Sequence, residues 1–248
     1  MEQQNKPGLT EEEKKARLGK FTGSCAIKLI TDPITVKDRK AGKLSKTLQS
    51  YIIENLGEEN TGTAEYFSSR HTDYGLQFEA EGIEAVERAY RITVEPATFV
   101  PHYKYPEEAG CTPDGNMLKN GQLEMKNPDK VLNHFRYLLL NNWLDLKRNY
   151  PEVYWQQQYN LLCARKKWSL FASYCRYASP QLQLKTIVVP ANAKDQELLE
   201  ERLEAAIDYK NILKLQMSRG HIAPLPDPYQ PVERPEENSG ALANWENL

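Results

Sequence analysis

The segment AGCTPDGNMLKNGQLEMKNP, residues 109–128, holds the pattern that decides the fold. Two short segments, AGCTPDG and GQLEMKNP, flank the stretch NMLKN, which predicts two strands joined by a turn. An antiparallel return would bring Asp114 across from the region of Glu124. Side chains two positions apart on a strand point to the same face, so Lys126 lies beside Glu124. The segment therefore predicts two carboxylates and one lysine converging at the edge of a sheet.

This trio favours the chemistry of phosphodiester hydrolysis. Two neighbouring carboxylates repel each other, and their pKa values rise unless a cation neutralises them. Mg²⁺ prefers hard oxygen ligands and retains water, and we expect Mn²⁺ to substitute for it. Such a cation polarises a phosphoryl oxygen and acidifies a coordinated water, while a lysine stabilises the charge that develops. The alternative is a surface hairpin with a Glu–Lys salt bridge, because the triplet E-x-K is common.

The longer segment GCTPDGNMLKNGQLEMKNP resembles the catalytic hairpin of PD-(D/E)XK nucleases, most closely the YqaJ-like viral recombinase family that includes bacteriophage lambda exonuclease. Further segments resemble that family in the same order along the chain: RLGKFTGS at 17–24, YGLQFEAEG at 74–82, YWQQQYNLLCARKKW at 154–168 and LFASY at 170–174. The resemblance covers roughly residues 14–190. It implies an α/β fold with a restriction-endonuclease-like core, in which helices flank a central mixed sheet.

The resemblance also implies a role for each residue that matches a family motif. Asp114 and Glu124 would bind metal, together with the backbone carbonyl of Met125. Lys126 would be the catalytic lysine. Glu79 would lie near the metals and help to hold a second one; the alternative is an ordinary carboxylate on a helix.

Two more positions, Arg17 and Ser24, match the part of the family motif that binds a DNA 5′-phosphate. Arg17 offers a bidentate fork to phosphate, and Ser24 near a helix N-terminus suits an anion. Arg39, in the basic loop, is a weaker candidate for the same pocket. In the glutamine-rich helix, Gln156 is the preferred partner of the catalytic lysine, and Gln158 is the alternative register. The alternative for Arg17 is a solvated charge on a helix, and the alternative for the two glutamines is a polar helix surface.

The remaining pattern predicts the other elements and their order. We expect a short helix from about residue 22, a loop at 34–46, edge strands within 92–105, strands within 167–177 and 182–190, and helices at 45–57, 72–90, 130–148, 151–166 and 194–220. This order is typical of an α/β domain with a mixed sheet. We expect residues 1–220 to form a single domain and residues 221–248 to form a polar, Pro-rich tail.

Composition narrows the class of protein further. The formal net charge is −2, so no global positive field marks a nucleic-acid binder, although residues 14–46 contain ten Lys and Arg against Asp32 and Asp38. The four cysteines show no C-x-x-C spacing, which argues against a zinc site or a disulfide framework. No apolar run approaches about 18 residues and no signal-peptide core is present, so we expect a cytoplasmic protein without a membrane span.

The leading hypothesis is a Mg²⁺-dependent 5′→3′ exonuclease that acts on double-stranded DNA ends and leaves 3′ overhangs. The resemblance implies phage-type recombination in a bacterial host cytoplasm, a single-strand annealing protein as partner, and a homo-oligomeric ring, most simply a trimer. One alternative is an endonuclease built on the same core. Another is a non-catalytic module that binds DNA ends, against which the intact Asp114, Glu124 and Lys126 argue.

Overall fold

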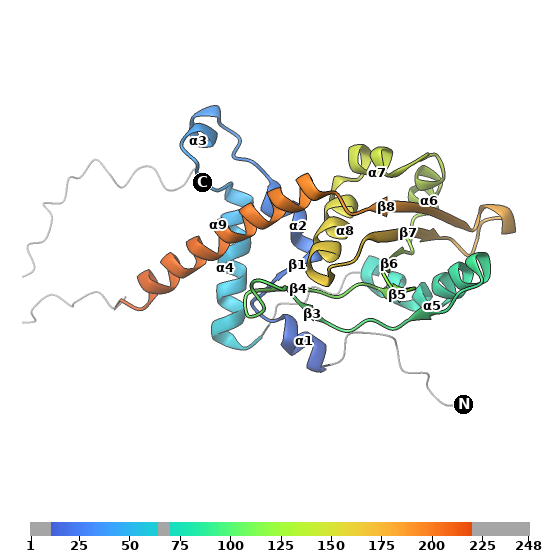
Figure 1. Cartoon of the computed structure of the whole chain (residues 1–248), viewed down its shortest axis with the longest axis horizontal. Coiled ribbons are helices and arrows are strands. Elements are labelled where there is room, and N and C mark those ends of the chain that lie inside the picture. The colour runs from blue at the N-terminus through green and yellow to red at the C-terminus, as the bar shows by residue number, and fades with distance from the viewer. Residues whose placement is uncertain (1–10, 64–69, 220–248) are drawn as a thin grey trace, which may run out of the picture.

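A five-stranded mixed sheet forms the centre of the protein (Figure 1), for which a computed structural model describes residues 11–63 and 70–219. Its strands occur in the order β2 (Val94–Glu95), β5 (Gly115–Met117), β6 (Gly121–Lys126), β7 (Trp168–Tyr174) and β8 (Leu184–Pro190). β5 and β6 form an antiparallel hairpin, β6 and β7 are parallel, and β7 and β8 are antiparallel. β6 is therefore an inner strand with a partner on each side.

A smaller sheet of three strands lies beside the central one. It is built from β1 (Phe21–Thr22), β4 (Ala109–Cys111) and β3 (Val100–Pro101), in that order. β1 pairs in parallel with β4, so the segments that follow these two strands leave the small sheet in the same direction. The segment from β4 then runs into the hairpin of the central sheet, which links the two sheets directly.

Helices cover both faces of the central sheet. α5 (Arg70–Tyr90) packs against the apolar face of β6, where Leu123 and Met125 join Val86 in one buried cluster. α8 (Pro151–Ala164) lies on the other face and supplies the centre of a second, larger cluster. The remaining helices surround these two: α1 (Glu11–Arg17), α2 (Ala26–Ile30), α3 (Val36–Lys40), α4 (Lys46–Thr61), α6 (Val131–Leu138), α7 (Trp143–Asn149), α9 (Ala193–Met217) and the short 3-10 turns η1 (Gly23–Cys25) and η2 (Pro180–Leu182).

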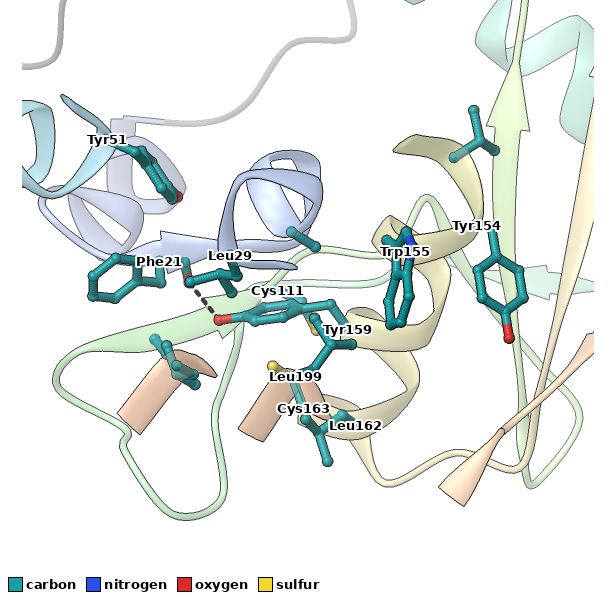
Figure 2. Packing of buried hydrophobic residues seen from close by; sticks show 14 of the residues in the cluster. Phe21, Leu29, Tyr51, Cys111, Tyr154, Trp155, Tyr159, Leu162, Cys163 and Leu199 are labelled. Carbon is teal, nitrogen blue, oxygen red and sulfur yellow. Dashed lines mark hydrogen bonds between the residues drawn. The ribbon is translucent and has the colours of Figure 1, made fainter. Parts of the chain in front are cut away.

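The larger cluster ties α8 to the N-terminal part of the chain. Figure 2 shows Tyr159 of α8 reaching Phe21, and its hydroxyl donates to the Phe21 carbonyl at 2.8 Å. Leu199 of α9 packs into the same cluster and is fully buried. Because β1 and η1 rest on α8 through these contacts, the position of the N-terminal segment is fixed relative to the sheet.

Several sequence-based expectations differ from the structure. The helix expected at 130–148 is two helices, because the Asn142 side chain accepts from the backbone N–H groups of Leu144 and Asp145 and begins a new helix. The loop expected at 34–46 contains α3, which Thr35 caps. The helix expected from residue 22 begins instead with β1 and η1, and α2 follows.

The segment AGCTPDG also differs from the single strand predicted for it. Its first part is β4 in the small sheet, and β5 of the central sheet begins only at Gly115. The predicted tail at 221–248 lies outside the described residues, and so does the side chain of His71. No helix within 11–63 or 70–219 is long and apolar enough to cross a bilayer.

Candidate active site

The hairpin holds Asp114 at the position that the sequence predicted. Gly115 pairs with Leu123, which places Asp114 opposite Glu124. The backbone N–H of Asp114 donates to the Leu123 carbonyl at 3.2 Å, and its Oδ2 accepts from the Met125 N–H at 2.6 Å. The Asp114 carboxylate is therefore bonded to the strand that carries the other acidic residue.

Glu124 and Lys126 lie side by side on β6 and face α8. Lys126 Nζ donates to Glu124 Oε1 at 2.6 Å. Glu124 is only 1% exposed, because its strand is an inner strand of the sheet. The surface salt bridge considered as an alternative does not describe this pair, since a carboxylate at the surface would be solvated.

α8 contributes two polar side chains to the same site, one helical turn apart. Gln156 Oε1 accepts from Lys126 Nζ at 3.2 Å, and Asn160 Nδ2 donates to Glu124 Oε2 at 3.4 Å. Gln158 points elsewhere, since its amide donates to the Pro190 carbonyl and accepts from the Asn192 N–H. Of the two glutamine registers, the geometry thus brings Gln156 to the lysine. Sequence reasoning missed Asn160, although its i+4 spacing from Gln156 would have placed it on the same helix face.

The site has more acidic side chains than basic ones. Burial raises the pKa of Asp114 well above its usual range, with further increases from Glu124 and Glu79 that Lys126 only partly offsets. Burial also raises the pKa of Glu79, and Glu124 adds to that increase. Burial lowers the pKa of Lys126, but Glu124 and Asp114 outweigh it, so its pKa is raised overall and the side chain is an ammonium at neutral pH. The lysine is therefore a hydrogen-bond donor in this site, and the carboxyl groups favour an added cation.

The donor set fits a hard divalent cation. Asp114 and Glu124 are neighbouring carboxylates whose mutual repulsion a cation would relieve, and Met125, whose backbone carbonyl is the third expected ligand, follows Glu124 directly on β6. Within the described ranges, no three His, Cys, Asp or Glu side chains are close enough to bind a metal by themselves. Mg²⁺ commonly uses one or two carboxylates and completes its shell with water, so two carboxylates suffice. Glu79 lies near enough to influence Asp114 but does not complete a three-carboxylate cluster.

A cavity of about 700 Å³ connects this site to the N-terminal helix. Asp114 and Glu79 line one part of it, and Arg17, at the end of α1, lines another. Arg17 Nη1 donates to Thr112 Oγ1 at 3.2 Å, so the guanidinium is held close to the segment that leads into the hairpin. The structure thus brings Arg17, Asp114 and Glu79 to one cavity.

Ser24 and Arg39 do not line this cavity. Ser24 is exposed on η1, and its Oγ lies 3.3 Å from Thr22 Oγ1. The parallel pairing of β1 with β4 carries Ser24 and Thr112 out of the small sheet together. Arg39 is exposed on α3, which Figure 1 shows projecting away from β5 and β6. The structure does not bring Arg39 to Arg17.

Comparison with known proteins finds solved structures that share this fold. No family model matches the sequence, and no curated protein matches it. Among solved structures, the exonuclease LHK-Exo in complex with dAMP is 22% identical, with a TM-score of 0.72 over 85% of this chain and 97% of that one. The alkaline exonuclease LHK-Exo from Laribacter hongkongensis is 21% identical, with a TM-score of 0.67 over 84% and 98%.

A third solved structure agrees with these two. A phage-related exonuclease from Haemophilus somnus 129PT is 17% identical, with a TM-score of 0.65 over 80% of this chain and 96% of that one. The chain has the fold of these exonucleases. The predicted fold class, an α/β restriction-endonuclease-like core with a mixed sheet between helices, is thereby confirmed. The match extends over nearly the whole of each exonuclease, so the fold is shared as a complete domain and not as an isolated hairpin.

Proposed function

We propose that the protein is a Mg²⁺-dependent deoxyribonuclease that degrades one strand of double-stranded DNA from the 5′ end and leaves a 3′ overhang. The observation that carries this proposal is the contact of Lys126 with Glu124, directly across the hairpin from Asp114. A salt bridge alone would need only two of these residues. The third residue, Asp114, lies opposite Glu124 with a raised pKa, and a cation bound by the two carboxyl groups would relieve their repulsion.

Each residue then has a distinct task. A divalent cation bound by Asp114 and Glu124 would polarise the scissile phosphate and acidify a water molecule. Lys126, as an ammonium, donates a hydrogen bond to the oxygen on which negative charge develops. Gln156 holds Lys126 in place through the 3.2 Å contact. Glu79 lines the adjoining cavity and is available to a second cation.

The polarity of digestion is proposed to follow from a 5′-phosphate pocket. Arg17 lines the same cavity as Asp114, and its guanidinium matches a terminal phosphate in charge and shape. Ser24 and Thr112 would add hydroxyl donors, because they lie on the two segments that follow β1 and β4 out of the small sheet. A 5′-phosphate held there would present the adjacent phosphodiester to the acidic pair. Arg39, on a separate helix, is proposed to contact DNA only outside this pocket.

We further propose a homo-oligomeric ring, with a trimer favoured, acting in the host cytoplasm beside a single-strand annealing protein in phage-type recombination. Encirclement would retain DNA without a strongly basic surface, which agrees with a net charge of −2. Light scattering tests the ring: the expected mass is three times 28.5 kDa, and a monomeric mass would contradict it.

Labelled duplexes test the activity itself. A linear duplex that carries different labels at its 5′ and 3′ ends should lose the 5′ label first, as mononucleotide, in the presence of Mg²⁺. A covalently closed circle of the same sequence should remain intact, because it offers no end. Cutting of the circle would favour the endonuclease alternative, and binding of ends without any cleavage would favour the non-catalytic one.

A further inference from the structure

Asn160 reaches the one oxygen of Glu124 that Lys126 leaves free. Lys126 Nζ donates to Oε1 at 2.6 Å, and Asn160 Nδ2 donates to Oε2 at 3.4 Å. Asn160 is 1% exposed, so water does not compete for this contact. The Glu124 carboxylate therefore has one donor on each oxygen, one from its own strand and one from α8.

The same side chain also touches the turn that carries Ser24. Gly23 packs against Asn160 so closely that a β-carbon added to Gly23 would lie 2.0 Å from Asn160 Oδ1. The backbone of Asn160 is held as well, because its carbonyl accepts from Cys111 Sγ at 3.7 Å. Asn160 thus lies between Glu124 and η1, with contacts to both.

We propose that Asn160 is a positioning residue, which fixes the Glu124 carboxylate and sets its spacing from the turn that bears Ser24. This inference rests on the proposed nuclease function. A neutral amide suits the task, because it restrains the carboxylate without neutralising it, whereas a second cationic side chain would reduce the attraction for a metal ion. Side chains that orient a metal-binding carboxylate typically change metal affinity or activity about 10- to 100-fold when they are removed.

The substitution Asn160→Leu tests the inference, because leucine has a similar size and lacks the donor. We expect kcat on 5′-phosphorylated duplex to fall about 10- to 100-fold, with weaker Mg²⁺ binding measured by calorimetry on the DNA-free protein. KM for duplex ends should change by less than about threefold, since the DNA contacts remain. The matched control is Gln158→Met, which removes another buried amide from the same helix on the side that faces β8.

Gly23→Ala provides a second, independent variant. It keeps the Asn160 amide but displaces this side chain, because the added β-carbon would overlap Asn160 Oδ1. We expect it to lower kcat and also to reduce the preference for 5′-phosphorylated over 5′-hydroxyl ends, since it moves the turn of Ser24. Normal kcat and Mg²⁺ affinity in Asn160→Leu, or equal losses in Gln158→Met, would overturn the inference while the nuclease function stood. A wild-type protein without nuclease activity would overturn both.

Discussion

Asp114 makes a structural contact with the same carboxyl group that, in the proposed function, binds a cation. Its Oδ2 accepts from the Met125 N–H and so fixes the hairpin, which leaves Oδ1 available to a ligand. Burial and the nearby Glu124 and Glu79 raise its pKa, and Lys126 opposes them. In the absence of a cation, the ionised form of Asp114 therefore destabilises the folded protein.

The substitution Asp114→Asn should stabilise the cation-free protein at pH 8. The unfolded chain ionises Asp114 near pH 3.8, whereas the folded protein ionises it only at a higher pH. Stability of the wild type is therefore lost as pH rises through the raised pKa, and the neutral variant escapes this loss. Each kcal/mol of difference corresponds to about 2–4 °C in Tm for a chain of this size.

Thermal melts at pH 4 and pH 8, with and without Mg²⁺, measure the effect of Asp114→Asn. The two proteins should converge near pH 4, and Mg²⁺ at pH 8 should raise the Tm of the wild type more than that of the variant. A variant that is less stable than the wild type by the same amount at both pH values would show that Asp114 carries no raised pKa.

Arg17 should determine the preference for a phosphorylated 5′ end. The substitution Arg17→Ala removes the guanidinium from the cavity that Asp114 also lines, so the ratio of digestion rates on 5′-phosphate and 5′-hydroxyl duplexes should fall to about one. An interaction of this charge-assisted kind is worth about 1.5–3 kcal/mol, or roughly 10- to 150-fold in rate. An Arg17→Ala protein that retained the wild-type ratio would exclude Arg17 from the pocket.

At the scale of elements, α9 holds the N-terminal segment through a buried lysine. Lys210 is 1% exposed and donates to the Gly19 carbonyl at 2.8 Å and to Glu108 Oε2 at 2.6 Å. It also lies 2.9 Å from Glu59 on α4. Gly19 follows Arg17 closely and adopts a positive φ of 67°, where a side chain would meet Glu59. This cluster therefore fixes the path between α1 and β1.

The substitution Lys210→Met should destabilise the protein by about 1–3 kcal/mol, because it leaves Glu108 and the Gly19 carbonyl without their buried donor. Breaking a fully buried ion pair costs roughly 3–5 kcal/mol. The loss for Lys210→Met should be smaller, since Lys214 still pairs with Glu59 and Glu108. Urea unfolding measures it, and Lys214→Met, in a more exposed position, is the control with an expected loss below about 1 kcal/mol. Equal losses for the two variants would contradict the structural role assigned to Lys210.

The sequence predicted those elements whose signals are local. The two strand-like segments on either side of the turn NMLKN predicted the hairpin, a stripe of apolar residues predicted α5, and an amphipathic pattern predicted α9. The small sheet was not predicted, because strands of two or three residues carry no alternation and the pairing of β1 with β4 joins distant parts of the chain. Asn160 was missed because α8 is buried on several sides, so no polar face distinguished it.

At the scale of the whole molecule, the candidate site depends on three separate regions. The hairpin supplies the acids and the lysine, α8 supplies Gln156 and Asn160, and the segment from α1 to η1 supplies Arg17 and, in the proposed 5′-phosphate pocket, Ser24. The smaller sheet and Lys210 set the distance between the first and the last of these. Since the net charge is slightly negative, we expect local geometry and enclosure, more than a global field, to retain DNA.

If Asp114, Glu124 and Lys126 form one hydrolytic centre, the substitution Lys126→Ala should remove most of the nuclease activity. The measurement is the rate at which 5′-phosphorylated linear duplex releases mononucleotides in Mg²⁺, with Lys119→Ala as the control on the exposed turn of the same hairpin. We predict a loss of at least about 100-fold for Lys126→Ala, with the control at the wild-type rate. Because Lys126→Ala also leaves the buried Glu124 without its Nζ donor, all rates are compared at a temperature well below the Tm of both variants. A Lys126→Ala protein that digests DNA as fast as the wild type would contradict this prediction.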